Sequence, residues 1–285
     1  MRCWRAGDTL MRAAILQMSS GIDPARNADV LTAAVAEAGA GGAAMLFTPE
    51  MSGLLDRERP RGAVHLRTEQ DDPVLQAVRR AAAAAGIWVH LGSLALLGGR
   101  DGRQVNRGFV IDDQGAIRAR YDKLHLFDVD LPSGESWRES AAYAPGEHAV
   151  VAHTPWAPIG LSVCYDIRFA ALYRALSDAG AEILSVPAAF TVPTGEAHWH
   201  ILLRARAIES ACFVIAAAQT GLHEDGRSTF GHSLVIDPWG EVLLDMGETV
   251  GLGYADLDLA RVVDVRSRVP VLRHRRAIPQ VERAG

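Results

Sequence analysis

Three polar residues, far apart in the sequence, each follow a segment with the pattern of a β-strand. Glu50 ends the apolar run AAMLFTPE, Lys123 follows AIRARYD, and Cys164 ends IGLSV. Ligands of open α/β sheets bind beyond the strand ends, so the three side chains can meet at one edge. A thiol beside an acid and a cation makes an activated nucleophile. The acid takes the thiol proton, and the cation stabilises negative charge on sulfur or on a carbonyl oxygen.

Each of these residues also has a purely structural interpretation. A lone cysteine usually packs in a core, and a lone glutamate or lysine is usually solvated. A cysteine nucleophile with a histidine base is a second catalytic interpretation, since the chain has 10 histidines, but none follows a predicted strand near Cys164. His198 and His200 lie two residues apart on a predicted helix, so their rings point to different faces and do not favour a metal site.

The elements that must position these residues alternate between strand and helix. Apolar runs and helical spacing predict strands over 12–18, 43–50, 87–96, 159–163, 181–190 and 212–219, and helices over 27–38, 73–85, 169–178 and 197–211. Hairpins predicted over 109–122 and 232–245 indicate mixed rather than purely parallel sheets. We therefore expect an α/β domain of two packed sheets covered by helices.

One glycine-rich segment can be rejected as a dinucleotide site. The sequence GAGGAA at 39–44 matches the spacing G-x-G-x-x-A, but it follows a predicted helix and precedes a strand. A bound phosphate must meet the start of a helix that follows a strand, so this order is wrong. A loop that ends the helix is the better interpretation.

Composition limits the partners and the compartment. The chain has 285 residues and a net charge of -5, which argues against a nucleic-acid or anionic-membrane partner. No apolar segment is long enough to span a bilayer. The three cysteines, Cys3, Cys164 and Cys212, do not make a disulfide framework and favour a cytoplasmic location. We expect a disordered extension over 1–10 and a single domain over 11–285.

Six blocks in a fixed order identify a family resemblance. They are FTPEMS, YDKLHLFD, WRES, GLSVCYDIRF, PAAFTVPTGEAHWHILLRARAIES and FGHSLVIDPWGEVL. Together they resemble the nitrilase, or carbon–nitrogen hydrolase, superfamily, and within it the Nit branch of deaminated glutathione amidase and omega-amidase. The resemblance implies a four-layer α-β-β-α sandwich, dimers formed by helices next to the catalytic cysteine, and no metal or organic cofactor.

The resemblance also implies roles for individual residues. A Glu-Lys-Cys triad falls on Glu50, Lys123 and Cys164, and a supporting glutamate falls on Glu139 in WRES. The backbone N–H of Tyr165, directly after the nucleophile, is expected to bind the oxyanion together with the lysine. The implied reaction converts an amide to an acid and ammonia through an acyl-thioester.

The implied substrate is a terminal amide of a small carboxylate-bearing molecule of the α-keto acid type. Arg168 is expected to bind the carboxylate, because guanidinium groups match carboxylates, and Phe190 and Thr194 are expected to line the pocket. His200 and the loop 132–139 differ from the pattern of relatives and are expected near the entrance, where they affect substrate length and polarity. Two alternatives stay open: another specificity, for an aliphatic amide, an N-carbamoyl amino acid or a nitrile, and a non-catalytic protein that binds a partner.

Overall fold

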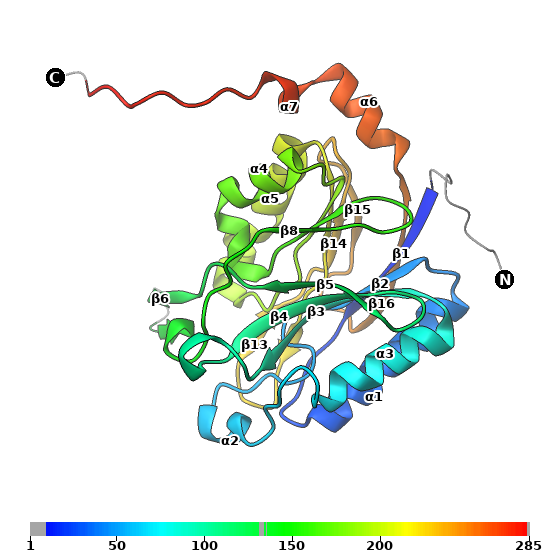
Figure 1. Ribbon diagram of the computed structural model, residues 1–285, viewed down its shortest axis with the longest axis vertical. Helices are drawn as coiled ribbons and strands as arrows, with labels where there is room; N and C mark the ends of the chain where they lie inside the picture. The colour runs from blue at the N-terminus through cyan, green and yellow to red at the C-terminus, as the bar shows by residue number, and fades with distance from the viewer. Residues whose placement is uncertain (1–9, 131–133, 135, 284–285) are drawn as a thin grey trace.

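The computed structural model describes residues 10–130, 134 and 136–283. Two six-stranded sheets pack face to face, and each carries a pair of helices on its outer face (Figure 1). The predicted four-layer α-β-β-α sandwich is therefore confirmed. The extension expected over 1–10 lies outside the described residues except for Leu10, which already begins the first strand.

The first sheet has the strand order β16-β1-β2-β3-β4-β5, in which β1, β2 and β3 are parallel and the other neighbours are antiparallel. Its strands are β1 (Leu10–Gln17), β2 (Met45–Phe47), β3 (Trp88–Leu96), β4 (Val105–Ile111), β5 (Ile117–Asp122) and β16 (Gly251–Asp258). Helices α1 (Pro24–Ala40) and α3 (Pro73–Ala85) cover its outer face. Each begins with an aspartate whose side chain accepts a backbone N–H of the first turn, followed by proline at the first helical position.

The second sheet has the order β15-β14-β11-β10-β9-β8, again with three parallel strands, β9, β10 and β11, in its interior. Its strands are β8 (Val150–Ala152), β9 (Ile159–Leu161), β10 (Ile183–Ser185), β11 (Phe213–Ala216), β14 (Leu234–Ile236) and β15 (Val242–Asp245). Helices α4 (Ala170–Asp178) and α5 (Val192–Ser210) cover its outer face. The mixed sheets expected from the two hairpins are confirmed in both halves.

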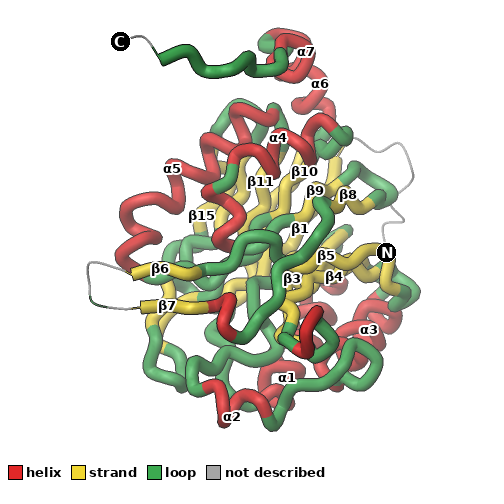
Figure 2. The backbone as a smooth tube through the Cα atoms, turned by 60° about the vertical axis from the view of Figure 1, so that its left-hand side comes forward, coloured by secondary structure: helices red, strands yellow, loops and turns green. Residues whose placement is uncertain are grey.

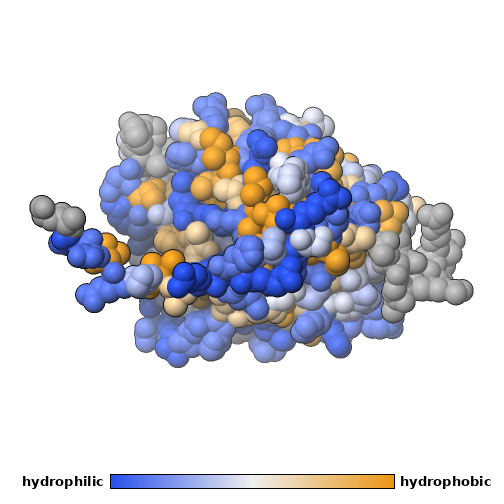
Figure 3. Space-filling model, turned by 90° about the horizontal axis from the view of Figure 1, so that it is seen from above, coloured by the Kyte–Doolittle hydropathy of each residue, from blue (hydrophilic) through white to orange (hydrophobic). Residues whose placement is uncertain are grey.

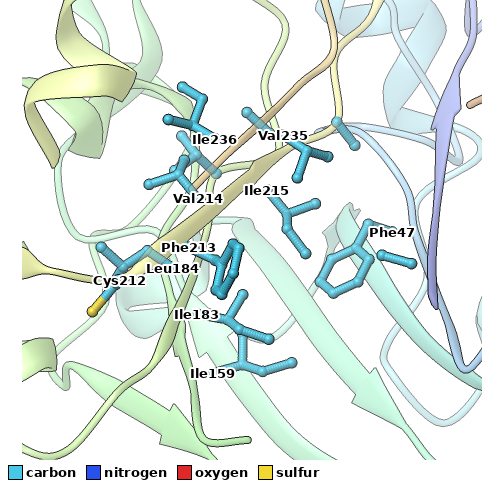
Figure 4. Close-up of a cluster of buried hydrophobic side chains, with 14 of the residues drawn as sticks. Phe47, Ile159, Ile183, Leu184, Cys212, Phe213, Val214, Ile215, Val235 and Ile236 are labelled. Carbon is cyan, nitrogen blue, oxygen red and sulfur yellow. The ribbon is translucent and has the colours of Figure 1, made fainter. Parts of the chain in front are cut away.

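The main core lies between the two sheets. Figure 4 shows Phe47 of β2 facing Ile159, Ile183 and Ile215 of the second sheet, and all four side chains are fully buried. A second cluster fills the space between the first sheet and the helices α1 and α3. Because side chains alternate along a strand, β1 supplies Ile15 to the first cluster and its neighbours to the second.

Several short elements lie outside these layers, between the strands and helices or after β16. They are α2 (Arg59–Ala63), β6 (Asp128–Asp130), β7 (Ser136–Arg138), β12 (Thr220–Leu222), β13 (Ser228–Phe230), α6 (Ala260–Arg268), α7 (Val271–His274) and the 3₁₀ turns η1 (Arg100–Gly102), η2 (Glu139–Ala141) and η3 (Cys164–Arg168). Figure 2 shows the β6–β7 hairpin beside α5, and the arm after α7 extending from the body. Over the described ranges, no helix has both the length and the apolar composition that crossing a membrane requires.

Candidate active site

Seven of the eight residues predicted for the site line a single cavity of about 690 Å³. These seven are Glu50, Lys123, Glu139, Cys164, Tyr165, Phe190 and Thr194. The first four come from loops that follow β2, β5, β7 and β9. These polar side chains therefore lie just beyond strand ends, as the sequence predicted for three of them. A cavity of this size suits a small organic ligand.

Glu50 is positioned by a loop that leaves the first sheet early. The strand was predicted to run to residue 50, but β2 ends at Phe47. Gly92 of β3 lies so close to this loop that a Cβ there would be 2.1 Å from the carbonyl oxygen of Thr48. Met51 then adopts a left-handed backbone with φ of 55°, and its N–H donates to Ser93 at 3.0 Å. The close approach and the reversal together aim the Glu50 carboxylate into the cavity.

Lys123 lies between two carboxylates. Its Nζ donates to Oε1 of Glu50 at 2.9 Å, to Oε2 of Glu139 at 2.9 Å and, at a longer 3.2 Å, to Oε1 of Glu139. Burial alone lowers the pKa of Lys123, but the charges of Glu139 and Glu50 raise that pKa well above its ordinary value. The lysine is therefore a permanent ammonium ion. One N–H directed at Glu50 and one shared between the two oxygens of Glu139 leave the third for another acceptor.

Asn106, which the sequence did not single out, completes this cluster. Its Nδ2 donates to Oε1 of Glu50 at 2.9 Å and to Oε1 of Glu139 at 3.2 Å. Its backbone carbonyl accepts the backbone N–H of Lys123 at 3.0 Å. The residue is buried in β4, beside the cavity. Asn106 lies in the part of the strand VNRGFVI that our predicted hairpin, starting at residue 109, left out, and a lone amide there gave no signal of this role.

Cys164 occupies a strained turn directly after the second sheet. Its φ of 50° is left-handed, which a non-glycine residue adopts at a cost of about 1–3 kcal/mol. Its N–H donates to the carbonyl of Pro187 at 2.9 Å, and the chain then enters the 3₁₀ turn η3. Among the described residues the N–H of Tyr165, next in this turn, has no hydrogen-bond partner. Such a free donor beside a nucleophile can bind developing negative charge on oxygen.

The resting thiol of Cys164 is neutral. Burial raises its pKa well above the ordinary value, and the negative charge of Glu50 raises it further, while Lys123 acts in the opposite direction. The thiol faces the carboxylate of Glu50, whose Oε2 accepts the N–H of Ala189 at 3.0 Å. A buried neutral thiol in contact with a carboxylate requires that carboxylate as a base before it can act as a nucleophile.

Asp166 joins the loop of the lysine to the turn of the cysteine. Its fully buried carboxylate accepts the Tyr121 hydroxyl at 2.7 Å, the backbone N–H of His125 at 3.0 Å and that of Val163 at 2.9 Å. The ring of His125 is also 2.7 Å from this carboxylate and stacks on Phe169. These contacts fix Lys123 relative to Cys164, so Asp166 has a positioning role.

Arg168 is the predicted site residue that the structure does not bring to the cavity. Its guanidinium lies 5.5 Å from the ring centroid of Phe190 and 5.9 Å from that of Tyr165, and it is 3.3 Å from Nδ1 of His198. It therefore packs behind two side chains that do line the cavity. His200, expected near the entrance, is likewise not a lining residue. Of the loop 132–139, residues 132, 133 and 135 lie outside the described ranges, and 136–139 line the cavity.

The comparisons with known proteins agree with this arrangement. The family model described as carbon-nitrogen hydrolase matches residues 12–267. The chain is 39% identical to a deaminated glutathione amidase of Yersinia enterocolitica over 267 residues, which is 93% of each chain.

Two solved structures extend the likeness to the fold. The crystal structure of the NitFhit protein of C. elegans superposes with a TM-score of 0.86 at 38% identity, covering 94% of this chain and 65% of that one. A mutant of an amidase from Nesterenkonia sp. AN1, with acrylamide added at its active-site cysteine, gives a TM-score of 0.75 at 29% identity, covering 91% of this chain and 98% of that one. The chain belongs to the carbon–nitrogen hydrolase family of the nitrilase superfamily and is a hydrolase that acts on amides.

Proposed function

We propose that this enzyme hydrolyses an amide of a small carboxylate-bearing substrate, of the deaminated glutathione or α-keto acid amide type, through a thioester on Cys164. The observation that carries the proposal is the contact between the neutral Cys164 thiol and Glu50, whose carboxylate is itself fixed by Lys123 at 2.9 Å. This geometry supplies a nucleophile, a base and a cation in one cavity. No cofactor enters the reaction.

The first step forms the carbon–sulfur bond. Glu50 takes the proton of the Cys164 thiol, and the sulfur attacks the amide carbon while the carbonyl π electrons move to oxygen. The resulting negative charge is bound by the third N–H of Lys123 and by the backbone N–H of Tyr165. Loss of one such donor typically costs about 10²–10³ in rate.

The second half of the reaction returns the enzyme to its resting state. The carbon–nitrogen bond breaks as Glu50 returns its proton to the nitrogen, which leaves as ammonia from a primary amide or as an amine from a substituted one. Water, deprotonated by Glu50, then attacks the thioester, and the carbon–sulfur bond breaks to release the acid and the thiol. Glu139 and Asn106 hold Lys123 and Glu50 in place throughout.

The cavity contains a better candidate than Arg168 for binding a substrate carboxylate. Four arginines line it: Arg57, Arg59, Arg138 and Arg227. Two of these form ion pairs with aspartates, and a third donates to a backbone carbonyl. Arg57 has no such side-chain contact within the described part of the chain, so its guanidinium is available for a carboxylate. Arg168 then acts indirectly, through Phe190.

A homodimer is the assembly that we propose. Exposed apolar side chains lie on α5, with Ile201 and Ile208 70% and 49% exposed, one heptad apart. The arm after α7 carries Ile278 and Val281, about four-fifths exposed, and Figure 3 shows hydrophobic atoms on this arm. Burial of such surfaces favours self-association. Light scattering of the purified protein should give twice the mass of one chain, and a single-chain mass at micromolar concentration would refute the dimer.

The negative net charge supports the absence of a nucleic-acid partner, and the two described cysteines, both free, support a cytoplasmic location. Separation of the protein from nucleic acid and from membranes in fractionated cells tests both points. Stable retention in either fraction would contradict them.

A substrate panel tests the proposed specificity. Deaminated glutathione, α-ketoglutaramate, an aliphatic amide, an N-carbamoyl amino acid and a nitrile are compared by kcat/KM, with detection of the released acid by mass spectrometry. We expect a carboxylate-bearing keto amide to lead, and a lead by the nitrile or the carbamoyl compound would refute the specificity. No turnover of any compound would favour the non-catalytic, partner-binding alternative, with Cys164→Ala as the matched blank.

A further inference from the structure

Two histidines and an aspartate converge outside the active-site cavity. His200 on α5, His232 just before β14 and Asp245 at the end of β15 place their ligand atoms within 4.8 Å of one another. Nε2 of His200 is 3.0 Å from Oδ2 of Asp245, and Nδ1 of His232 is 2.9 Å from Oδ1. We propose that this His–His–Asp cluster binds one divalent transition-metal ion of the Zn²⁺ type.

The backbone around the cluster is fixed from several directions. His232 has a left-handed φ of 53°, its N–H donates to the Gly247 carbonyl at 2.6 Å, and its own carbonyl accepts the Trp199 indole N–H at 2.8 Å. The ring of Phe230 stacks on the His232 ring, with centroids 4.5 Å apart. A histidine held in this strained conformation has a ring whose direction is set in advance, which lowers the cost of ordering it around an ion.

The carboxylate is also held in place by a group that does not compete with a metal. The backbone N–H of Gly247 donates to Oδ1 of Asp245 at 2.9 Å, which orients the carboxylate toward the two imidazoles. Hydrogen bonds of this kind, outside the ligand set, commonly orient ligands around a metal. Small side-chain movements would bring the three ligand atoms to the roughly 2.0–2.2 Å that zinc bonds require.

The ligand chemistry selects the class of ion. Two imidazole nitrogens and one carboxylate oxygen suit zinc and its neighbours, whereas magnesium and calcium prefer sets made of oxygen alone. The side chains of His200, His232 and Asp245 are 37%, 26% and 34% exposed, so an ion can enter and water can complete its coordination. The sequence HWH did not favour a metal site, because His198 points elsewhere. The other two ligands come from segments that only the fold brings to His200.

The expected role of the ion is structural. It would tie α5 to the β14–β15 hairpin, and Phe230, stacked on His232, packs against α5 at Gly195 and donates its N–H to the carbonyl of Phe190 at 3.0 Å. Phe190 lines the active-site cavity, but the three proposed ligands do not. Metal binding should therefore stiffen one wall of the cavity without entering the reaction.

Calorimetry with Zn²⁺ alone tests the site in the full-length protein, first treated with a chelator and then dialysed. The Cys164→Ala background keeps the active-site thiol from competing for the ion. We expect one ion per chain and a rise in Tm on adding Zn²⁺. Loss of a residue that only orients a metal ligand typically weakens metal binding about 10–100-fold. Replacement of a ligand itself, in His232→Ala or Asp245→Asn, should weaken Zn²⁺ binding by at least as much. His198→Ala, which removes another histidine from the same helix, should leave binding unchanged.

Two results would overturn the site. One is the absence of saturable Zn²⁺ binding by the Cys164→Ala protein. The other is equal binding by this protein and by its His200→Ala and Asp245→Asn derivatives. A lower Tm of the ligand variants that does not depend on Zn²⁺ would identify the cluster as a hydrogen-bonded group only. These results are independent of the proposed amide hydrolysis, because binding and Tm are measured without substrate.

Discussion

Replacement of Glu139 by glutamine isolates the contribution of the second carboxylate beside the lysine. In the native site Oε2 of Glu139 accepts the N–H of Phe127 at 2.7 Å and Nζ of Lys123 at 2.9 Å. Its Oε1 accepts Nδ2 of Asn106 and Nζ of Lys123, both at 3.2 Å. The glutamine oxygen can keep the first two contacts, but its NH₂ group must then face the NH₂ group of Asn106 and the ammonium group of Lys123. Asn106 can respond by turning its buried, unpartnered Oδ1 toward the glutamine, at the cost of its bond to Glu50.

The magnitude follows from the interaction that is lost. A hydrogen bond to a charged group contributes about 1.5–3 kcal/mol, and the variant converts the one between Glu139 and Lys123 to a neutral-acceptor bond. If Lys123 stabilises the oxyanion from this position, the loss acts on the transition state and lowers kcat by about 10- to 150-fold. We expect KM to change much less, because the glutamate does not contact the proposed carboxylate of the substrate.

Steady-state kinetics on the best amide of the panel, together with circular dichroism and Tm, provides the assay. Glu147→Gln is the control, because Glu147 lies outside the cavity and, among the residues that the structure describes, its side chain forms only an exposed ion pair with Arg100. We expect it to match the wild-type enzyme, since exposed ion pairs contribute about 0–1 kcal/mol. A folded Glu139→Gln enzyme with kcat within about twofold of wild type would refute the positioning of Lys123 by Glu139.

Three further substitutions test the substrate pocket, the contacts of Asp166 and the buried core. Arg57→Ala should raise KM for a carboxylate-bearing amide about tenfold or more and leave a neutral aliphatic amide unaffected; the same pattern in Arg168→Ala alone would restore the original expectation for Arg168. Asp166→Asn puts an NH₂ donor where the neighbouring groups are themselves donors, so it should lower the free energy of unfolding by about 3 kcal/mol and Tm by roughly 5–10 °C. An unchanged Tm by calorimetry would contradict the positioning role of Asp166. Burial lowers the pKa of His90 from 6.5 to about 3. Near pH 5 the unfolded chain therefore binds a proton on this histidine, whereas the folded chain does not. Because of this difference, the free energy of unfolding should fall by about 2 kcal/mol from about pH 7 to about pH 5. Urea unfolding measures this loss, and His90→Gln should lack the histidine's share of it.

The three residues that we propose as catalytic could be predicted to lie together, because each follows a recognisable strand pattern within a recognisable block. Glu50, Lys123 and Cys164 follow segments with a strand pattern, and the packing of the two sheets brings these strand ends to one cavity. Long, periodic elements were also predictable, and α3 begins at Pro73 and ends at Ala85 as expected. In these cases local pattern and tertiary packing favour the same structure.

What the sequence could not provide depends on contacts between distant segments. Asn106 acquires its role only when β4 lies beside the loops of Glu50 and Glu139, and an isolated amide carries no such signal. Arg168 follows Cys164 by four residues, which suggested the pocket, but at the end of the 3₁₀ turn η3 its guanidinium lies over the ring of Phe190 and does not line the cavity. Strands of three residues, such as β6 and β7, are too short to show a period.

The predicted length of elements failed where the backbone changes direction for steric reasons. The strand expected to reach Glu50 stops at Phe47, because the following residues bend over Gly92. The helix expected from residue 197 already begins at Val192, with proline in its first turn. In both places the departure brings a lining residue of the cavity, Glu50 or Thr194, to its position.

The central claim is that Cys164 carries the acyl group during turnover. Wild-type enzyme mixed with the best amide of the panel, quenched with acid during turnover, can be analysed by intact-protein and peptide mass spectrometry. We expect a transient mass increase equal to the acyl part of the substrate, located on the peptide that contains Cys164, and neither the increase nor turnover in a folded Cys164→Ala protein. Turnover by Cys164→Ala, or an acyl group on another residue, would contradict the mechanism.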